Sequence, residues 1–343
     1  MVCLVLAGSV RRIQATGGGS YVITLPKDWV KRFGLESGGE VLVEYTPDGS
    51  LRVRPLSSTG GQRLLHVGLD AGDNGAEELL RWIVSYYISG VDVIEISVGK
   101  RSGLVHELVP LVSSRLMGVE VVEESWDRIV FQVVVDPASM PLDRSFSRLA
   151  RTVGYMLDDL ARGIKGGDSS LLGSIPTRDD VVDKLFIFVW RQVFLILSGR
   201  RLVRELGARS LPDAILVMAA AKNIERIGDH VSSIASAAVG LGGSCLQGLA
   251  GVVEEADRVY REATAVFTRP SRQQAEEAMR TCLAARARLV EGLRAACGGR
   301  AEEIHTVAHS LRRVVDYSTD IVELAMNRFA AWSMEGLEAG GGR

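Results

Sequence analysis

Apolar residues change their spacing twice along the chain, and these changes divide it into three kinds of segment. Between residue 11 and about residue 55, apolar and polar residues alternate between turns rich in glycine, proline and serine. Such alternation predicts short strands joined by hairpins. We expect strands at 11–15, 21–25, 40–45 and 51–54, and one short helix at 27–33. The run Ser57-Ser-Thr-Gly-Gly61 that follows is predicted to be a linker.

The second segment, residues 63–136, mixes both periodicities. It predicts the order strand, helix, strand, helix, strand, strand, at 64–70, 76–89, 91–98, 103–117, 118–124 and 128–135. Each helix is amphipathic enough to cover one face of a sheet, so a small split α/β domain is expected. The segment contains no glycine loop that would hold a phosphate and no catalytic constellation.

From Pro141 onward apolar residues recur at the helical spacing nearly to the end of the chain. Turn-forming residues interrupt the pattern at 163–176, 207–212, 240–243, 268–271 and 298–299. The breaks predict six helices in two sets of three, over 141–240 and 243–335. Internal repetition of this kind indicates two tandem three-helix bundles.

The third helix of each set carries two acids four residues apart, Glu225 with Asp229 and Asp316 with Asp320. Each acid of the first pair precedes its counterpart by 91 residues. Carboxylates at this spacing share one helix face and repel each other unless a cation or a basic side chain lies between them. The duplicated pairs therefore predict two equivalent cation sites. The alternative is an ordinary solvated face with salt bridges, for which the nearby basic residues are Arg226, Arg312 and Arg313.

A third acidic pair, Asp179 and Asp183, opens the second helix of the first set. It could face the acids of the third helix, or it could be a helix cap favoured by the macrodipole. The same 91-residue offset leads from this pair to Pro270 and Gln274, and the nearest acids there are Glu276 and Glu277. The second site is thus expected to be poorer in ligands or lost.

Composition narrows the function classes. The chain has 343 residues, a net charge of −2 and a pI near 6.3, which predicts two or three domains and argues against a globally basic nucleic-acid coat. Its four cysteines show no metal-binding spacing and indicate free buried thiols in a cytosolic protein. The most apolar stretch, Leu185 to Leu197, is too short for a membrane helix and contains Arg191. We expect a cytoplasmic protein without membrane insertion.

The run from Ala219 to Val231, which includes Asn223-Ile-Glu-Arg-Ile-Gly-Asp-His230, resembles the third-helix signature of the PhoU family. PhoU proteins are phosphate-uptake regulators built from two tandem three-helix bundles, and their E/D-x-x-x-D pairs bind multinuclear metal clusters, described chiefly with iron. The resemblance covers about residues 141–335. It implies the metal ligands Glu225, Asp229, Asp316 and Asp320, with Asp179 and Asp183 as further candidates.

Oxygen ligands alone would suit Mg, Mn or Ca as well as iron. The Glu-x-x-His pairs of a ferritin-like diiron oxidase do not occur in the sequence. His305 and His309 share a face with Asp316 and Asp320, but their counterparts in the first set are Ala214 and Met218. We therefore leave the histidines, including His230, out of the expected site.

The segment from Arg11 to Glu40 resembles the AbrB/SpoVT group of swapped-hairpin DNA-binding domains. These domains dimerise by interleaving strands, and basic residues of both subunits contact DNA. By position, the resemblance implies DNA contacts from Arg11, Arg12, Lys27, Lys31 and Arg32. The alternative is a domain that only dimerises the protein, with Lys27–Arg32 as a solvated helix face interrupted by acids such as Asp28.

Together the three parts resemble archaeal phosphate-uptake regulators of this composite type. The leading hypothesis is a homodimeric transcription regulator of phosphate uptake that binds promoter DNA and carries a metal-binding helical sensor, with inorganic phosphate as a metal-bridged ligand. The alternative is an adaptor that docks on a phosphate ABC transporter or a signalling kinase. A metallohydrolase is disfavoured because no nucleophile, general base or oxyanion-hole motif accompanies the acids, so a non-enzyme is expected.

Overall fold

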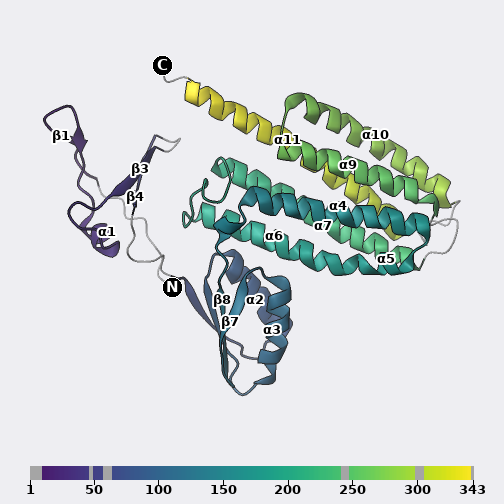
Figure 1. The fold of residues 1–343 in the computed structure, drawn as a ribbon, viewed down its shortest axis with the longest axis horizontal. Helices are drawn as coiled ribbons and strands as arrows, with labels where there is room; N and C mark the ends of the chain where they lie inside the picture. The colour runs from purple at the N-terminus through teal and green to yellow at the C-terminus, as the bar shows by residue number, and fades with distance from the viewer. Residues whose placement is uncertain (1–9, 46–48, 57–63, 241–246, 298–304, 341–343) are drawn as a thin grey trace. The chain divides into compact units, whose positions relative to one another are not determined.

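The computed structural model describes residues 10–45, 49–56, 64–240, 247–297 and 305–340. The chain divides into two compact units, Met1–Leu64 and Leu65–Arg343, each of which is described by itself (Figure 1). The predicted linker at 57–61 and the predicted helix break at 298–299 lie outside the described residues.

The first unit contains two separate antiparallel hairpins and one helix. Its elements are β1 (Gln14–Ala15), β2 (Tyr21–Val22), α1 (Lys27–Arg32), β3 (Val41–Tyr45) and β4 (Leu51–Pro55). Ala15 pairs with Tyr21, and Val43 pairs with Val53. The turn between β1 and β2 places Gly18 and Gly19 at positive φ, which side chains other than glycine rarely adopt. The first two strands are shorter than predicted, whereas β3 and β4 agree closely with the prediction.

No described residue of the first unit is buried. Large apolar side chains such as Ile13, Tyr21 and Tyr45 stay exposed, and Tyr45 is 90% accessible. Isolated two-stranded hairpins are at best marginally stable in water. The unit therefore lacks a hydrophobic core of its own within its described residues.

The second unit begins with a four-stranded sheet and two helices, in the predicted βαβαββ order. The elements are β5 (His66–Asp70), α2 (Ala76–Ile88), β6 (Val93–Ser97), α3 (Gly103–Arg115), β7 (Val119–Glu124) and β8 (Arg128–Val133). The strand order is β5-β6-β8-β7, with β5 and β6 parallel and the other pairs antiparallel. Ile96 and Phe131 pack with Ile83 of α2 and Leu108 of α3 in one core.

The helical region has a hydrophobic core of its own, and two of its residues, Ile187 and Phe188, pack in the core of the sheet region. Its elements are α4 (Leu142–Gly166), α5 (Ser169–Ser174), α6 (Pro176–Leu197), α7 (Leu211–Val239), α9 (Ala250–Thr268), α10 (Arg272–Cys297) and α11 (His305–Gly340). The long helices pack as an all-α assembly in which α7 contacts both α6 and α11 (Figure 1). The fold class predicted from the sequence, small strands, then mixed α/β, then helices, is confirmed.

The prediction of six helices missed α5. A break was expected from Gly163, but α4 continues to Gly166, and α5 follows because the Asp168 side chain accepts a hydrogen bond from the Leu171 amide and caps it. Gly163 instead permits a close approach: a Cβ at this position would lie 2.8 Å from a methyl carbon of Leu172. None of the described helices combines the length and the apolar character needed to cross a bilayer.

Buried polar contacts join the α/β sheet region to α6. Arg191 of α6 is almost fully buried and donates hydrogen bonds to the carbonyl oxygens of Tyr87 and Val91 and to the carboxylate of Asp92. Asp92 also accepts from Arg200, 2.6 Å away. Buried charge pairs of this kind need exact geometry, so they hold the two parts of the second unit in one arrangement.

Candidate metal site

Four carboxylates from α6 and α7 come together on one side of the first helical set. Glu225 and Asp229 lie one turn apart on α7, as their spacing predicts, and α6 contacts α7 along this stretch. One oxygen each of Asp183, Glu225 and Asp229 lies within 4.8 Å of the others. Glu225 is buried, and the other two acids are half-buried. Three carboxylates this close have the oxygen-rich arrangement that hard cations prefer.

Asp179 is the fourth member, one turn before Asp183 on α6. Its Oδ1 is buried and has no hydrogen-bond partner in the described structure. Gly228 allows this approach, since a Cβ at Gly228 would lie 3.1 Å from that oxygen and 3.2 Å from Val182. A buried acceptor without a donor is costly in a folded protein unless a cation or water satisfies it. The orphaned oxygen therefore fits a site for a metal ion.

Burial and neighbouring carboxylates raise the pKa of three of these acids, Asp179, Asp183 and Asp229. Burial, followed by the charges of Asp229, Asp183 and Glu225, raises the pKa of Asp179 to about 7. Burial, followed by the charges of Glu225 and Asp183, raises the pKa of Asp229 to about 6. Burial also raises the pKa of Asp183, and the guanidinium of Arg115 partly offsets this rise. Without a further cation the cluster is thus unfavourable as four ionised groups.

Three basic side chains already lie at the edge of the cluster. Lys222 Nζ is 2.7 Å from both carboxylate oxygens of Glu225, and Arg226 is 3.7 Å from Asp229. Arg115, at the end of α3 in the sheet region, pairs with Asp183. Asp179 has none of these partners and remains the least compensated acid.

The acids of the second set have a different environment. Asp316 is surrounded by three arginines, Arg286 at 3.2 Å, Arg313 at 3.6 Å and Arg312 at 3.8 Å. Burial raises the pKa of Asp320, with Glu323 adding to the effect and Arg313 opposing it. Within the described part of the chain, no third acid joins this pair in a metal-sized group.

The contacts identify the counterparts of the α6 acids on α10. Asp183 lies by Glu225, and Arg286 lies by Asp316, the counterpart of Glu225. Likewise Asp179 faces Gly228, and the buried Cys282 interacts with Thr319, the counterpart of Gly228. The residues Pro270 and Gln274, reached by a uniform offset, are therefore not the structural equivalents, because the connection before α11 differs in length from the one before α7.

The histidines form a separate contact between α7 and α11. The ring of His230 stacks on Tyr317 at 5.9 Å and lies 6.0 Å from the ring of His309. His230 Nδ1 is 3.2 Å from Ser310 Oγ, and burial lowers the pKa of His230 to about 4. None of them belongs to the acidic group that the described residues form.

The residues considered for DNA contacts are exposed. Arg11 and Arg12 precede β1, and α1 carries Lys27, Lys31 and Arg32. None of the five forms an ion pair within the described part of the chain. Five exposed cations without an ion pair among the described residues of one small unit suit contacts with phosphates.

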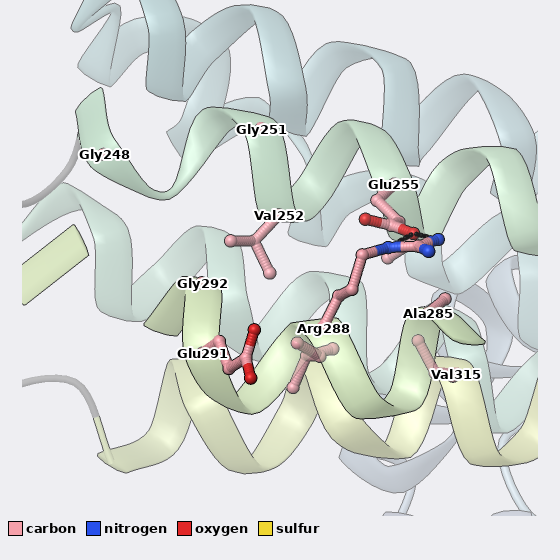
Figure 2. A pocket seen from close by; sticks show the side chains of 11 residues that line it. Gly248, Gly251, Val252, Glu255, Ala285, Arg288, Glu291, Gly292 and Val315 are labelled. Atoms are coloured by element: carbon pink, nitrogen blue, oxygen red, sulfur yellow. Dashed lines mark hydrogen bonds and ion pairs between the residues drawn. The ribbon is translucent and has the colours of Figure 1, made fainter. Parts of the chain in front are cut away.

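A groove of about 620 Å³ lies elsewhere, between α9, α10 and α11 (Figure 2). Three of its eleven lining residues are glycines, Gly248, Gly251 and Gly292, and the Arg288 guanidinium pairs with Glu255 at its wall. The groove thus offers mainly apolar and backbone surface. None of the four clustered carboxylates lines it, so we do not assign it a metal site.

Comparison with known proteins places two families on this chain. Residues 146–238, which contain α6, all of α7 except its last residue, and the four clustered acids, match the family model of the PhoU domain. Residues 14–60 match the family "Antidote-toxin recognition MazE, bacterial antitoxin". The chain therefore carries a PhoU domain and, towards its N-terminus, a MazE/AbrB-like domain.

Two solved structures are similar to this chain over about half of its length. PhoU from Pseudomonas aeruginosa is 21% identical, with 54% of this chain and 93% of that chain covered and a TM-score of 0.44. The phosphate transport system regulatory protein PhoU from Streptococcus pneumoniae is 18% identical, with 54% and 91% covered and a TM-score of 0.40. The search of curated proteins found no match.

Proposed function

We propose that this chain, which carries a PhoU domain and a MazE/AbrB-like domain, is a cytoplasmic regulator of phosphate uptake that acts as a homodimer on promoter DNA. In this proposal the DNA-binding head is residues 1–56, and the connecting domain is residues 63–136. The two helical repeats are residues 141–240 and 243–335. The observation that carries the sensing role is the orphaned Asp179 oxygen within four mutually repelling carboxylates.

The proposed metal ligands in the first repeat are Asp179, Asp183, Glu225 and Asp229. All are hard oxygen donors, which suit Mg, Mn, Ca or iron, and the PhoU resemblance favours iron. A bound ion would supply positive charge between the carboxylates and a coordination position at which inorganic phosphate could bridge. Asp316 and Asp320 remain candidates for a weaker second site, since arginines already compensate Asp316.

Titration calorimetry with Mn²⁺ tests the metal proposal. Glu225→Gln should weaken binding at least tenfold, because it removes a buried charged ligand. Asp316→Asn is the matched control in the other repeat and should leave the tight site unchanged. Equal loss in both variants, or no binding to wild type, would reject the assignment to α6 and α7.

The homodimer proposal rests on the missing core of the first unit. Interleaving hairpins from two copies would cover the exposed Ile13, Tyr21 and Tyr45. Sedimentation equilibrium should find a dimer that Tyr45→Glu weakens. A wild-type monomer at micromolar concentration would contradict this part of the proposal.

DNA binding is tested by fluorescence anisotropy with promoter DNA of phosphate-transport genes over a range of salt concentrations. Arg11→Ala/Arg12→Ala should lower the affinity and the salt slope, because each phosphate contact releases counterions. Arg144→Ala/Arg148→Ala, two exposed arginines of α4, is the control. If both double variants lower the DNA affinity equally, the DNA is attracted nonspecifically to the charge of the whole chain, and the assignment of the contacts to Arg11 and Arg12 is rejected.

A second candidate is an adaptor that docks on a phosphate ABC transporter or a signalling kinase, with the first unit serving only in dimerisation. The description of the matching family, antidote-toxin recognition, concerns protein recognition and supports this alternative. An adaptor should show no salt-dependent affinity for promoter DNA. No enzymatic activity is proposed for either role.

A further inference from the structure

Next to the acidic cluster, α6 and α7 expose two rows of large apolar side chains. On α6 these are Trp190, Phe194 and Leu197, which are spaced four and three residues apart and so share one helix face. On α7 they are Leu211 and Ile215. The five side chains are between 37% and 49% exposed.

The contacts between the helices set the two rows side by side. Lys222 Nζ lies 4.8 Å above the ring of Phe186, and one turn further Glu225 meets Asp183. Moving toward the C-terminus of α6 therefore corresponds to moving toward the N-terminus of α7, so the two helices are antiparallel. This register places Phe194 beside Ile215 and Leu197 beside Leu211. We call the set of Trp190, Phe194, Leu197, Leu211 and Ile215 the α6–α7 apolar face.

The apolar face is a single strip rather than scattered exposed residues. Contiguous apolar patches on a folded protein mark binding surfaces, whereas single exposed residues need no explanation. The Trp190 ring packs on Phe186 at 5.5 Å, so it is held in place before any partner arrives. Rigid, half-exposed aromatic residues are the side chains that contribute most at protein interfaces.

Charge distinguishes the two ends of the strip. Beyond Phe186 and Lys222 the same register continues to the carboxylates of Asp183 and Glu225. At the other end, Arg200 and Arg201 pair with acids of the sheet region, Asp92 and Asp136. The strip thus has an apolar part and one acidic end, at which the four clustered carboxylates outnumber three basic side chains, Lys222, Arg226 and Arg115.

We propose that the α6–α7 apolar face binds a helix of another protein, whose apolar side is followed at one end by lysine or arginine. The apolar part of the strip extends from Phe186 to Leu197, about 17 Å or three helical turns. A partner helix of this length would set its basic end against the acidic cluster. The proposal does not depend on metal in the cluster.

The charges disfavour two other occupants. Anionic lipid headgroups would be repelled by the carboxylates at the end of the strip. A second copy in antiparallel pairing would set these carboxylates against the end where Arg200 and Arg201 already have acidic partners. In parallel pairing the acids would meet each other. A basic amphipathic helix satisfies both parts of the surface.

The probe is a fluorescein-labelled helical peptide of about 14 residues, with a leucine stripe and lysines in its last turn. Anisotropy is measured on the full chain in EDTA, so that metal cannot compete for the carboxylates. A second peptide carries glutamates in place of the lysines. The lysine peptide should bind wild type, and the glutamate peptide should bind at least about tenfold more weakly.

Phe194→Glu and Ile215→Glu should each weaken the lysine peptide about tenfold or more. Both positions are partly exposed, so folding should persist, which circular dichroism checks. Tyr155→Glu, at an aromatic residue of α4 that is 60% exposed, is the control and should bind as wild type. Mn²⁺ and DNA titrations of the two variants should be unchanged, which separates this proposal from the proposed function.

Several results would overturn the proposal. Equal binding of the lysine and glutamate peptides would refute the role of the acidic end. Full binding to both Phe194→Glu and Ile215→Glu would refute the location, and absence of binding to wild type would refute the partner chemistry. Conversion of a wild-type dimer to a monomer by Phe194→Glu would show that a second copy covers the face instead.

Discussion

Arg115 should compete with a metal ion for Asp183. Its guanidinium comes from the end of α3, 68 residues before Asp183, and pairs with that carboxylate. A cation that binds Asp183, Glu225 and Asp229 together must displace this arginine or share the carboxylate with it. The substitution Arg115→Met removes the charge and keeps most of the apolar stem.

The size of the effect follows from the exposure of the pair. The Arg115 side chain is 36% exposed and that of Asp183 is 27% exposed, so solvent screens much of their attraction. Exposed pairs contribute about 0.2–1 kcal/mol, and the upper end suits a pair that is partly buried. If the ion no longer has to overcome about 1 kcal/mol of attraction between Arg115 and Asp183, its affinity should rise about fivefold.

Calorimetric titration of wild type and Arg115→Met at low ionic strength measures this difference. The difference in Mn²⁺ affinity between the two proteins should become smaller with added salt, because salt screens the attraction between Arg115 and Asp183. Arg272→Met, which breaks an ion pair with Glu276 in the other repeat, is the matched control and should titrate as wild type. Lys184 still donates to the Ser113 carbonyl at 2.6 Å, so α3 remains attached to α6 in Arg115→Met.

Unchanged or weaker Mn²⁺ binding in Arg115→Met would refute the competition, because the arginine would then not oppose the ion. A tighter site would have a further consequence. Since Arg115 belongs to the sheet region, ligand binding at α6 and α7 would release one contact between the two parts of the second unit, and the free energies of the two events would be linked.

Three further predictions concern stability and stoichiometry. The pKa of Asp179 is raised to about 7 in the fold, so its protonation stabilises the metal-free protein fully below the unfolded pKa near 4, and this contribution is lost as the pH rises through 7. Asp179→Asn should therefore raise the melting temperature in EDTA more at pH 8 than at pH 5. An equal rise at the two pH values would contradict the raised pKa. Asp213 is buried and accepts a 2.7 Å hydrogen bond from Arg328 Nε, so Arg328→Met should lower the free energy of urea unfolding by about 3–5 kcal/mol, and a loss below about 1 kcal/mol would show that the pair is dispensable. Arg286→Asp replaces the nearest cation of Asp316 by a third acid and should add a second, weaker Mn²⁺ equivalent in calorimetry; unchanged stoichiometry would mean that the remaining arginines suffice to exclude the ion.

The sequence by itself determined the elements and the local half of the site. Alternation and helical spacing are properties of neighbouring residues, so they predicted the βαβαββ order and the long helices. Glu225 and Asp229 share a face because four residues make about one helical turn, whatever the rest of the chain does. The short helix α5 was missed because a single cap, Asp168, decides it within a stretch dominated by turn residues.

Contacts between elements were decided only by the tertiary structure. Asp179 and Asp183 join the α7 acids, whereas Arg286 and Cys282 take the matching places on α10, since the packing register depends on connections whose lengths differ between the repeats. A uniform sequence offset cannot express that difference. Arg115 reaches Asp183 only through the packing of α3 on α6. Side chains on separate elements meet through packing and loop geometry, which periodicity within one element does not encode.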